Sequence, residues 1–273
     1  MTQKNPGAED LGEPDGVYNS SQPGSWSKAW QTDPMGGALS DHWPDLIATF
    51  RSRAPLGSMA PDFKGEVLDG QSVWLSDYRD HKSVLIVFGS LACPPCVTNI
   101  RINDPNLVGL YETYGEAVEF LYLYTREGHP GSKIVPHTTM EDKRQNARRL
   151  KAEEGITFPI VIDDLVGTIQ RSFVHPHFNN PVFLINRAGI VTYKSAWLDA
   201  SELPQVLEDQ VLWDRSAQTD ATIKKSYSER IRPLREPYDV NCNKRIKRLM
   251  DDIGLPQIAM GAIPGIDSEK TGG

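Results

Sequence analysis

The apolar and polar residues begin to follow a regular pattern after the first sixty positions, and this pattern predicts strands that alternate with helices. Two short segments flank Asp69-Gly70, a dipeptide typical of a hairpin turn. Pro181–Ser195 predicts a second hairpin. Between them lie continuous apolar runs, which are typical of strands buried on both faces. These runs are Ser83–Ser90, Ala117–Thr125 and Phe158–Asp164.

Helical periodicity follows each of these strands. The expected helices cover about Pro95–Tyr114, Glu141–Glu154, Leu165–Phe173 and Ala200–Leu212. Strands that alternate with helices indicate a mixed central sheet with helices on both faces. We therefore expect an α/β domain over residues 58–212, opened by a β-hairpin.

The two ends of the chain do not share this pattern. Residues 1–57 are rich in Gly, Pro, Ser and Asp, and we expect an arm that lies on a surface, with a short helix near Asp45–Arg53. Residues 213–273 predict a helical extension. Its segment Lys224–Arg248 contains nine basic residues against three acidic ones. We expect a solvated helical face there; the alternative is a patch that docks on an acidic surface.

Composition narrows the class of protein. The 273 residues are 39% hydrophobic and 24% charged, as in a globular domain, and the net charge is −7. An acidic chain argues against binding to nucleic acid or to an anionic membrane surface. No stretch approaches the ~20 apolar residues of a spanning helix. The first residues lack the basic start and apolar run of a secretory signal, so we expect a cytoplasmic protein whose thiols are reduced.

Cys93 and Cys96 are the first candidates for chemistry. Cys93 follows a predicted buried strand and precedes a helix, where unpaired N–H groups favour a thiolate. We expect Cys93 to attack and the less exposed Cys96 to resolve the adduct by forming a disulfide. A zinc site would need a second Cys-x-x-Cys pair, which the chain lacks. The third cysteine, Cys242, is expected to be a free thiol.

A strand, a Cys-x-x-Cys pair and a helix in this topology resemble the thioredoxin-like fold. Asn180-Pro181 stands where thioredoxin-like proteins carry a cis-proline that faces the dithiol. This resemblance predicts a cis bond at Pro181. We expect Asn180, Pro181 and Ser90 to contact the substrate.

Three further segments resemble the iodothyronine deiodinases, a branch of the thioredoxin-like group. They are VLIVFGSLACPPC, EFLYLYTREGHPGSK and HTTMEDKRQNARRL, within about Ser83–Leu212. The resemblance places Cys93 at the selenocysteine position and matches Glu127, His129, His137, Glu141 and Asp142 to family residues. It implies a thiol-dependent reductive dehalogenation, and it also implies a homodimer.

The chemistry implied by this resemblance requires a proton donor. His129 and His137 would relay a proton to the carbon that loses its halogen, and Glu127 would orient one imidazole. The chain departs from the family at Cys96, where the family has phenylalanine, and this change restores a resolving thiol. We therefore expect a thiol–disulfide oxidoreductase that uses this dithiol, with reductive dehalogenation as a further activity that the resemblance implies. The expected partners are a thioredoxin- or glutathione-like reductant and a small-molecule or disulfide substrate, with no cofactor.

Three other classes of function remain open. The segment around Ala60–Arg79 resembles the opening segment of the peroxiredoxin domain. Ser90 stands three residues before Cys93, which also suits a peroxidase. Cys93 and Cys96 with His175 or His177 would make a soft Cys2His copper site. The core could also be a scaffold, with the long ends binding a larger assembly.

Overall fold

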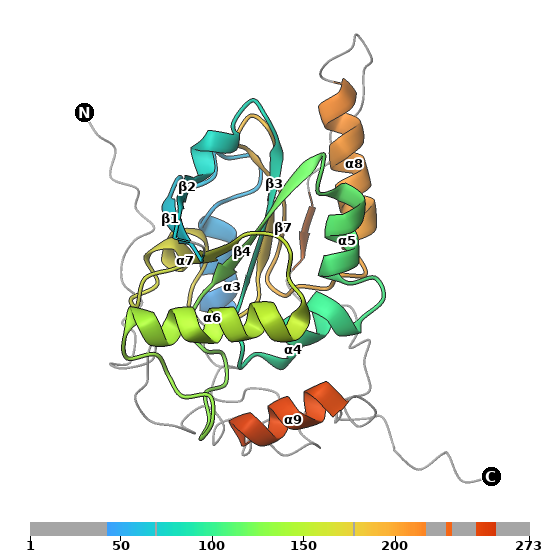
Figure 1. Ribbon diagram of the computed structural model, residues 1–273. Helices are drawn as coiled ribbons and strands as arrows, with labels where there is room; N and C mark the ends of the chain where they lie inside the picture. Colours follow the sequence, from blue (N-terminus) through green and yellow to red (C-terminus); the bar gives the residue numbers. More distant parts are fainter. Residues whose placement is uncertain (1–42, 69, 177, 217–227, 231–243, 255–273) are drawn as a thin grey trace, which may run out of the picture.

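The computed structural model describes residues 43–68, 70–176, 178–216, 228–230 and 244–254 (Figure 1). The strands are β1 (Lys64–Val67), β2 (Ser72–Trp74), β3 (Ser83–Gly89), β4 (Val118–Tyr124), β5 (Ile160–Ile162), β6 (Val182–Ile185), β7 (Val191–Ser195) and β8 (Ser228–Arg230). The longer helices are α3 (Trp43–Ser52), α5 (Leu107–Tyr114), α6 (Met140–Glu154), α8 (Leu203–Ser216) and α9 (Lys244–Ile253). Shorter helical segments are η1 (Leu75–Tyr78), α4 (Pro94–Val97), η2 (Thr98–Ile102) and α7 (Thr168–Phe173).

The strands form one mixed sheet in the order β2-β1-β5-β4-β3-β6-β7-β8. The three central strands β5, β4 and β3 run parallel, while β6 pairs antiparallel with β3. Each apolar run of the sequence therefore became a central strand, and both predicted hairpins, β1–β2 and β6–β7, are present. This is the mixed α/β sheet of the thioredoxin-like fold, as the sequence predicted.

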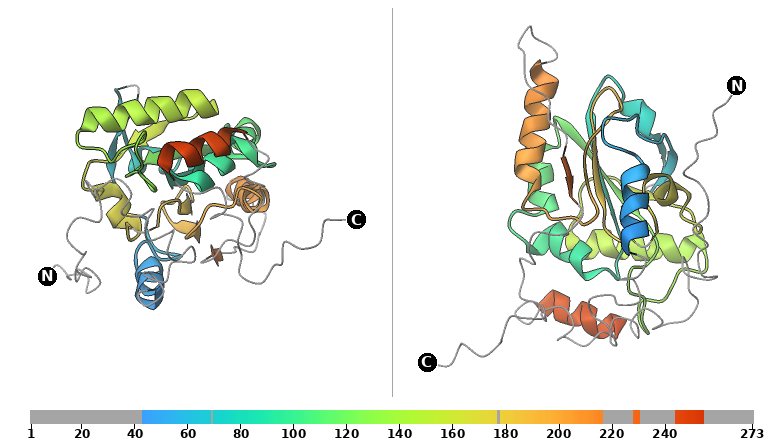
Figure 2. Two further views of the ribbon diagram at one scale, coloured as in Figure 1. Left: turned by 90° about the horizontal axis from the view of Figure 1, so that it is seen from below. Right: turned by 180° about the vertical axis from the view of Figure 1, so that it is seen from behind.

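Alternate residues of the central strands supply two separate apolar clusters, one on each face of the sheet. Leu85 and Val87 of β3 belong to the cluster that packs against α5, α6, α8 and α9. Ile86 and Phe88 point the other way and pack with α3 and α7. Figure 2 shows α3 covering the rear of the sheet, opposite α6. The period of two along a buried strand is what divides the core in this way.

The prediction of one continuous helix over Pro95–Tyr114 is wrong. The chain forms α4, then the π-helical turn η2, and α5 begins only at Leu107. Asn106 caps α5, because its side chain accepts the N–H of Gly109 at 3.0 Å. A proline removes an interior hydrogen bond from a helix, so Pro105 marks the break.

The C-terminal extension packs on the core in two places. β8 adds a parallel strand beside β7, which the sequence pattern did not predict. Helix α9 buries Ile246, Leu249, Met250 and Ile253 in the cluster shared with α6. The segment therefore docks through the apolar residues of this helix, while Lys244 and Arg248 are exposed, as expected for a solvated basic face. None of the helices in the described part of the chain is long and apolar enough to cross a bilayer.

Candidate functional site

The two cysteines lie where β3 ends and α4 begins. Cys93 is the N-cap of α4 and has an extended backbone, and Pro94 and Pro95 occupy the first two helical positions. Proline has no N–H, so these two positions offer no donor to the Cys93 sulfur. Cys96 is the first residue of the helix with an N–H to point at it. Both cysteines are free thiols in this structure.

Burial dominates the electrostatics of the dithiol. Cys93 is 0% exposed and Cys96 is 1% exposed, so the expected difference in exposure is absent. Burial raises the pKa of Cys93 well above its usual value, and the adjacent Cys96 and the charge of Glu127 raise it further. The N–H of Cys96 lowers this pKa, but its effect is smaller. The predicted low pKa of Cys93 is therefore wrong for this closed arrangement.

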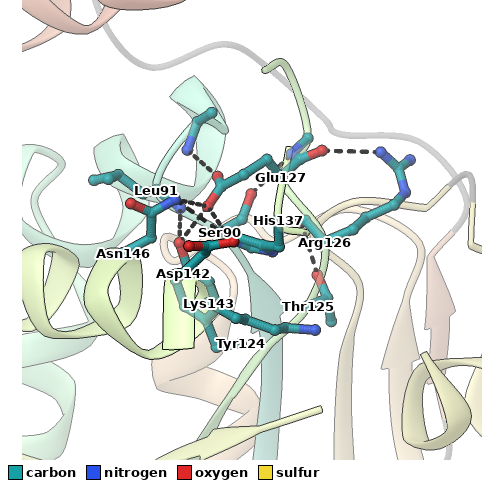
Figure 3. Close-up of polar contacts among 12 residues, drawn as sticks. Ser90, Leu91, Tyr124, Thr125, Arg126, Glu127, His137, Asp142, Lys143 and Asn146 are labelled. Carbon is teal, nitrogen blue, oxygen red and sulfur yellow. Dashed lines mark hydrogen bonds and ion pairs between the residues drawn. The ribbon is translucent and has the colours of Figure 1, made fainter. Parts of the chain in front are cut away.

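Glu127 anchors the backbone that leads into Cys93 (Figure 3). Its carboxylate accepts the N–H of Ala92 at 2.7 Å and the hydroxyl of Tyr124 at 2.5 Å. The amide of Asn146 donates to the same carboxylate at 3.1 Å. Burial alone would raise the pKa of Glu127, yet the hydrogen bonds from His137, Tyr124 and Ala92 bring it below its usual value. Glu127 is thus a buried carboxylate that is stabilised by hydrogen bonds from the protein.

The structure brings His137 and Glu127 together, as the resemblance implied. Nε2 of His137 lies 2.9 Å from Oε1 of Glu127, and both side chains are buried. His129 joins the site through its backbone, whose N–H donates to the carbonyl of Ala92 at 2.8 Å. Burial, and then the positive charge of Arg126, lower the pKa of His129 to about 4. Its imidazole is neutral at pH 7, so a relay that needs protonated His129 does not fit the buried arrangement seen here.

The loop after β4 lies over Cys93. Gly128 donates its N–H to the hydroxyl of Ser90 at 2.9 Å. A Cβ at Gly128 would stand 3.2 Å from the Cβ of Cys93 and 3.4 Å from the side chain of Asn179. Arg126 fixes the far side of the loop, because its guanidinium donates to Oδ1 of Asn179 at 2.7 Å. Ser90 therefore holds this loop in place, and its contact with a substrate stays a prediction.

The predicted cis bond at Pro181 is wrong. Among the described residues the cis peptide bond is Asp104–Pro105, and Asn180–Pro181 is trans. The sequence shows a proline, but the isomer depends on the tertiary surroundings. The carbonyl of Pro181 accepts the N–H of Phe88 at 3.0 Å. The side-chain amide of Asn180 is buried and has no hydrogen-bond partner among the described residues, which keeps it a candidate substrate contact.

Helix α9 lies below α4, the helix that begins directly after Cys93, as Figure 1 shows. It contacts α4, and it approaches Gly131 so closely that a Cβ there would overlap the backbone of Ile253. Ion pairs fasten it at both ends. Arg245 pairs with Glu154 of α6 at 2.7 Å, and Asp252 pairs with Lys133 at 2.9 Å.

The sequence interpretation missed Tyr122, Tyr124 and Asn146. The two tyrosines alternate along β4 and face the same side as the dithiol, so the LYLY pattern within a buried strand was the available signal. Asn146 lies one turn after Asp142 on α6. Thr139 caps that helix, and Asp142 completes the capping box by accepting the N–H of Thr139 at 2.8 Å, so the structure gives Asp142 a structural role.

The described residues test only one of the two versions of the copper hypothesis. No three His, Cys, Asp or Glu side chains of the described residues gather as metal ligands, so Cys93, Cys96 and His175 do not form a Cys2His site. His177 and Cys242 lie outside the described residues. The version of the hypothesis that uses His177 stays a prediction.

Comparison with known proteins bears on the same part of the chain. The model of the Redoxin family matches residues 55–201. The thiol-disulfide oxidoreductase ResA of Geobacillus thermodenitrificans is 30% identical over 143 residues, which is 52% of this chain and 70% of that protein.

Two solved structures are also similar. One is the thioredoxin domain of a thiol-disulfide oxidoreductase from Bacteroides vulgatus, at 22% identity and a TM-score of 0.45 over 57% of this chain and 97% of that one. The other is a DsbF homologue from Corynebacterium diphtheriae, at 19% identity and a TM-score of 0.41 over 56% of this chain and 87% of that one.

Proposed function

Since the chain belongs to the redoxin family, we propose that it is a thiol–disulfide oxidoreductase that works through Cys93 and Cys96. The observation that carries this proposal is the placement of two free thiols one helical turn apart, directly after the central strand β3. The likeness to ResA, whose name states this activity, supports it.

The reaction needs only the dithiol and a disulfide. The thiolate of Cys93 attacks one sulfur of the substrate disulfide, forms a mixed disulfide and releases the other half as a thiolate. The thiolate of Cys96 then attacks the sulfur of Cys93 and releases the second half. Two electrons pass to the substrate, the protons of the two cysteines go to the released thiols, and Cys93 and Cys96 end as a disulfide.

The electrostatics favour electron transfer out of the dithiol. A raised pKa at Cys93 means that the reduced form gains little from a stabilised thiolate. Oxidases such as DsbA owe their oxidising power to the opposite property, a stabilised reduced form. We therefore assign the role of reductant, regenerated by a thioredoxin- or glutathione-like thiol. The cytoplasmic location and the homodimer stay predictions.

Insulin reduction with dithiothreitol as the electron source tests this function. The wild type should speed the precipitation of the insulin B chain, and Cys93→Ser should abolish the increase. Cys242→Ser serves as the matched control, because it removes a thiol outside the Cys-x-x-Cys pair. A wild type no faster than Cys93→Ser would remove the proposal.

Reductive dehalogenation is a second candidate, favoured by the buried His137–Glu127 pair beside the dithiol. A histidine held by a carboxylate suits proton delivery to a carbon that loses its halogen. The assay is iodide release from an iodinated phenol with dithiothreitol. Release that depends on Cys93 and falls in His137→Gln would support this finer function, and release equal to that of Cys93→Ser would remove it.

A further inference from the structure

Tyr122 has a buried hydroxyl that the network around Glu127 does not use. The side chain is 0% exposed in β4, and its oxygen makes no hydrogen bond of normal geometry among the described residues, although the thiol of Cys96 lies near enough to raise the pKa of Tyr122. An unpaired buried hydroxyl destabilises a fold, and phenylalanine would fill the same volume without that cost. The neighbouring Tyr124 pairs its hydroxyl twice, with Glu127 and with the N–H of Leu91.

The position of Gly89 shows where this hydroxyl points. A Cβ on Gly89 would overlap the oxygen of Tyr122 and would stand 2.9 Å from Sγ of Cys96. The hydroxyl and the sulfur therefore share the small space that the missing side chain of Gly89 leaves open. Gly89 is the last residue of β3, the strand that leads into the dithiol.

We propose that the hydroxyl of Tyr122 donates a hydrogen bond to the thiolate of Cys96 whenever that thiolate forms. This inference rests on the proposed thiol–disulfide exchange. Cys96 carries negative charge at two moments: when it is about to attack Cys93, and when an external thiol attacks Cys93 and expels it. A donor that lies beside the sulfur can stabilise both states by a small rotation of its hydroxyl.

The phenol acts as a donor and keeps its proton. Burial and the nearby sulfurs of Cys96 and Cys93 raise the pKa of Tyr122 well above its usual value. The other titratable groups that face this space are Tyr124 and, on the side of Cys93, Glu127. Tyr122 is thus a positioning residue whose effect appears in the reactions of Cys96.

The test uses the protein's own disulfide. The oxidised full-length chain, with its Cys93–Cys96 bond formed, is mixed with dithiothreitol, and the remaining disulfide is measured after acid quenching and thiol labelling. Dithiothreitol attacks Cys93, Cys96 leaves as a thiolate, and a second attack releases oxidised dithiothreitol. Because a hydrogen bond to a charged group is lost, Tyr122→Phe should slow this reduction about tenfold.

Tyr111→Phe is the matched control, since its ring packs on Phe120 and Phe158 within the core. It should reduce at the wild-type rate. The midpoint of thermal unfolding of reduced Tyr122→Phe should equal or exceed that of the wild type, whereas a purely structural hydroxyl would lower it. A Tyr122→Phe disulfide that is reduced as fast as the wild type overturns the proposal.

A second measurement covers the case in which Tyr122→Phe does not fold. In reduced wild type labelled with ¹³Cζ-tyrosine, the Tyr122 signal should move as the dithiol is ionised by rising pH, and Cys96→Ala should abolish this movement. An unchanged signal overturns the proposal. Both measurements read the dithiol itself, so they give a result even if the wild type proves inert towards insulin, which would remove the proposed function alone.

Discussion

The hydroxyl of Tyr124 donates to the carboxylate of Glu127 at 2.5 Å and accepts the N–H of Leu91 at 3.1 Å. The same carboxylate holds the N–H of Ala92. The two residues directly before Cys93 are therefore fixed by one pair of side chains. This pair sets the backbone from which the nucleophilic sulfur projects.

Tyr124→Phe should destabilise the protein by about 1–3 kcal/mol, because it leaves the buried N–H of Leu91 unpaired and removes a donor from Glu127. Urea unfolding of reduced protein measures this change. Tyr122→Phe, two residues earlier on the same strand, should show no such loss. Equal destabilisation of the two variants would contradict the distinct roles given to the two hydroxyls.

His129 should make the stability of the fold depend on pH. Its pKa falls from 6.5 to about 4 on burial, so the unfolded chain binds more protons between these values. The free energy of unfolding therefore falls as the pH drops from 6.5 to 4, by about 3 kcal/mol from this group. Urea unfolding at several pH values gives the slope. His129→Gln should flatten it over this interval, and an unchanged slope would show that other groups cause it.

Loosening α9 should expose the dithiol. Glu153 of α6 pairs with Arg245 at 2.9 Å and with Arg248 at 2.8 Å. Glu153→Lys therefore replaces attraction with repulsion between α6 and the N-terminal half of α9. Iodoacetamide should then alkylate Cys93 severalfold faster than in the wild type. Glu141→Lys is the control, because Glu141 lies on the same helix and pairs with Arg144 and Arg148 of α6 instead.

Salt provides an independent check on the same prediction. High ionic strength screens the more exposed ion pairs of α9, those of Arg248 with Glu153 and of Lys133 with Asp252, so alkylation of Cys93 in the wild type should also rise between low and 1 M salt. Alkylation that is insensitive both to Glu153→Lys and to salt would mean that α9 does not control access to Cys93.

The central strands and the dithiol were predictable because their signals are local. Ser83–Gly89 is a continuous apolar run, and Cys-x-x-Cys follows it directly. The break in the helix after Cys96 was also readable, because Pro105 stands within the predicted segment.

Contacts between distant segments were not predictable from the pattern. Arg245 and Glu154 are 91 residues apart, and no local period shows that they pair. The prediction of a low pKa for Cys93 was wrong for the same reason. The start of a helix favours a thiolate, but burial of the thiol outweighs this effect. The pairing of Glu127 with His137 was reached through the family resemblance, since the nine residues between them form a loop without periodicity.

Trapping of a mixed disulfide shows which of the two cysteines attacks the substrate. Cys96→Ser and Cys93→Ser are each prepared with Cys242→Ser, treated with glutathione disulfide, and mapped by mass spectrometry of peptides. We expect a glutathione adduct on Cys93 in the Cys96→Ser protein and none on Cys96 in the Cys93→Ser protein. An adduct that forms on Cys96 but not on Cys93 would contradict this expectation.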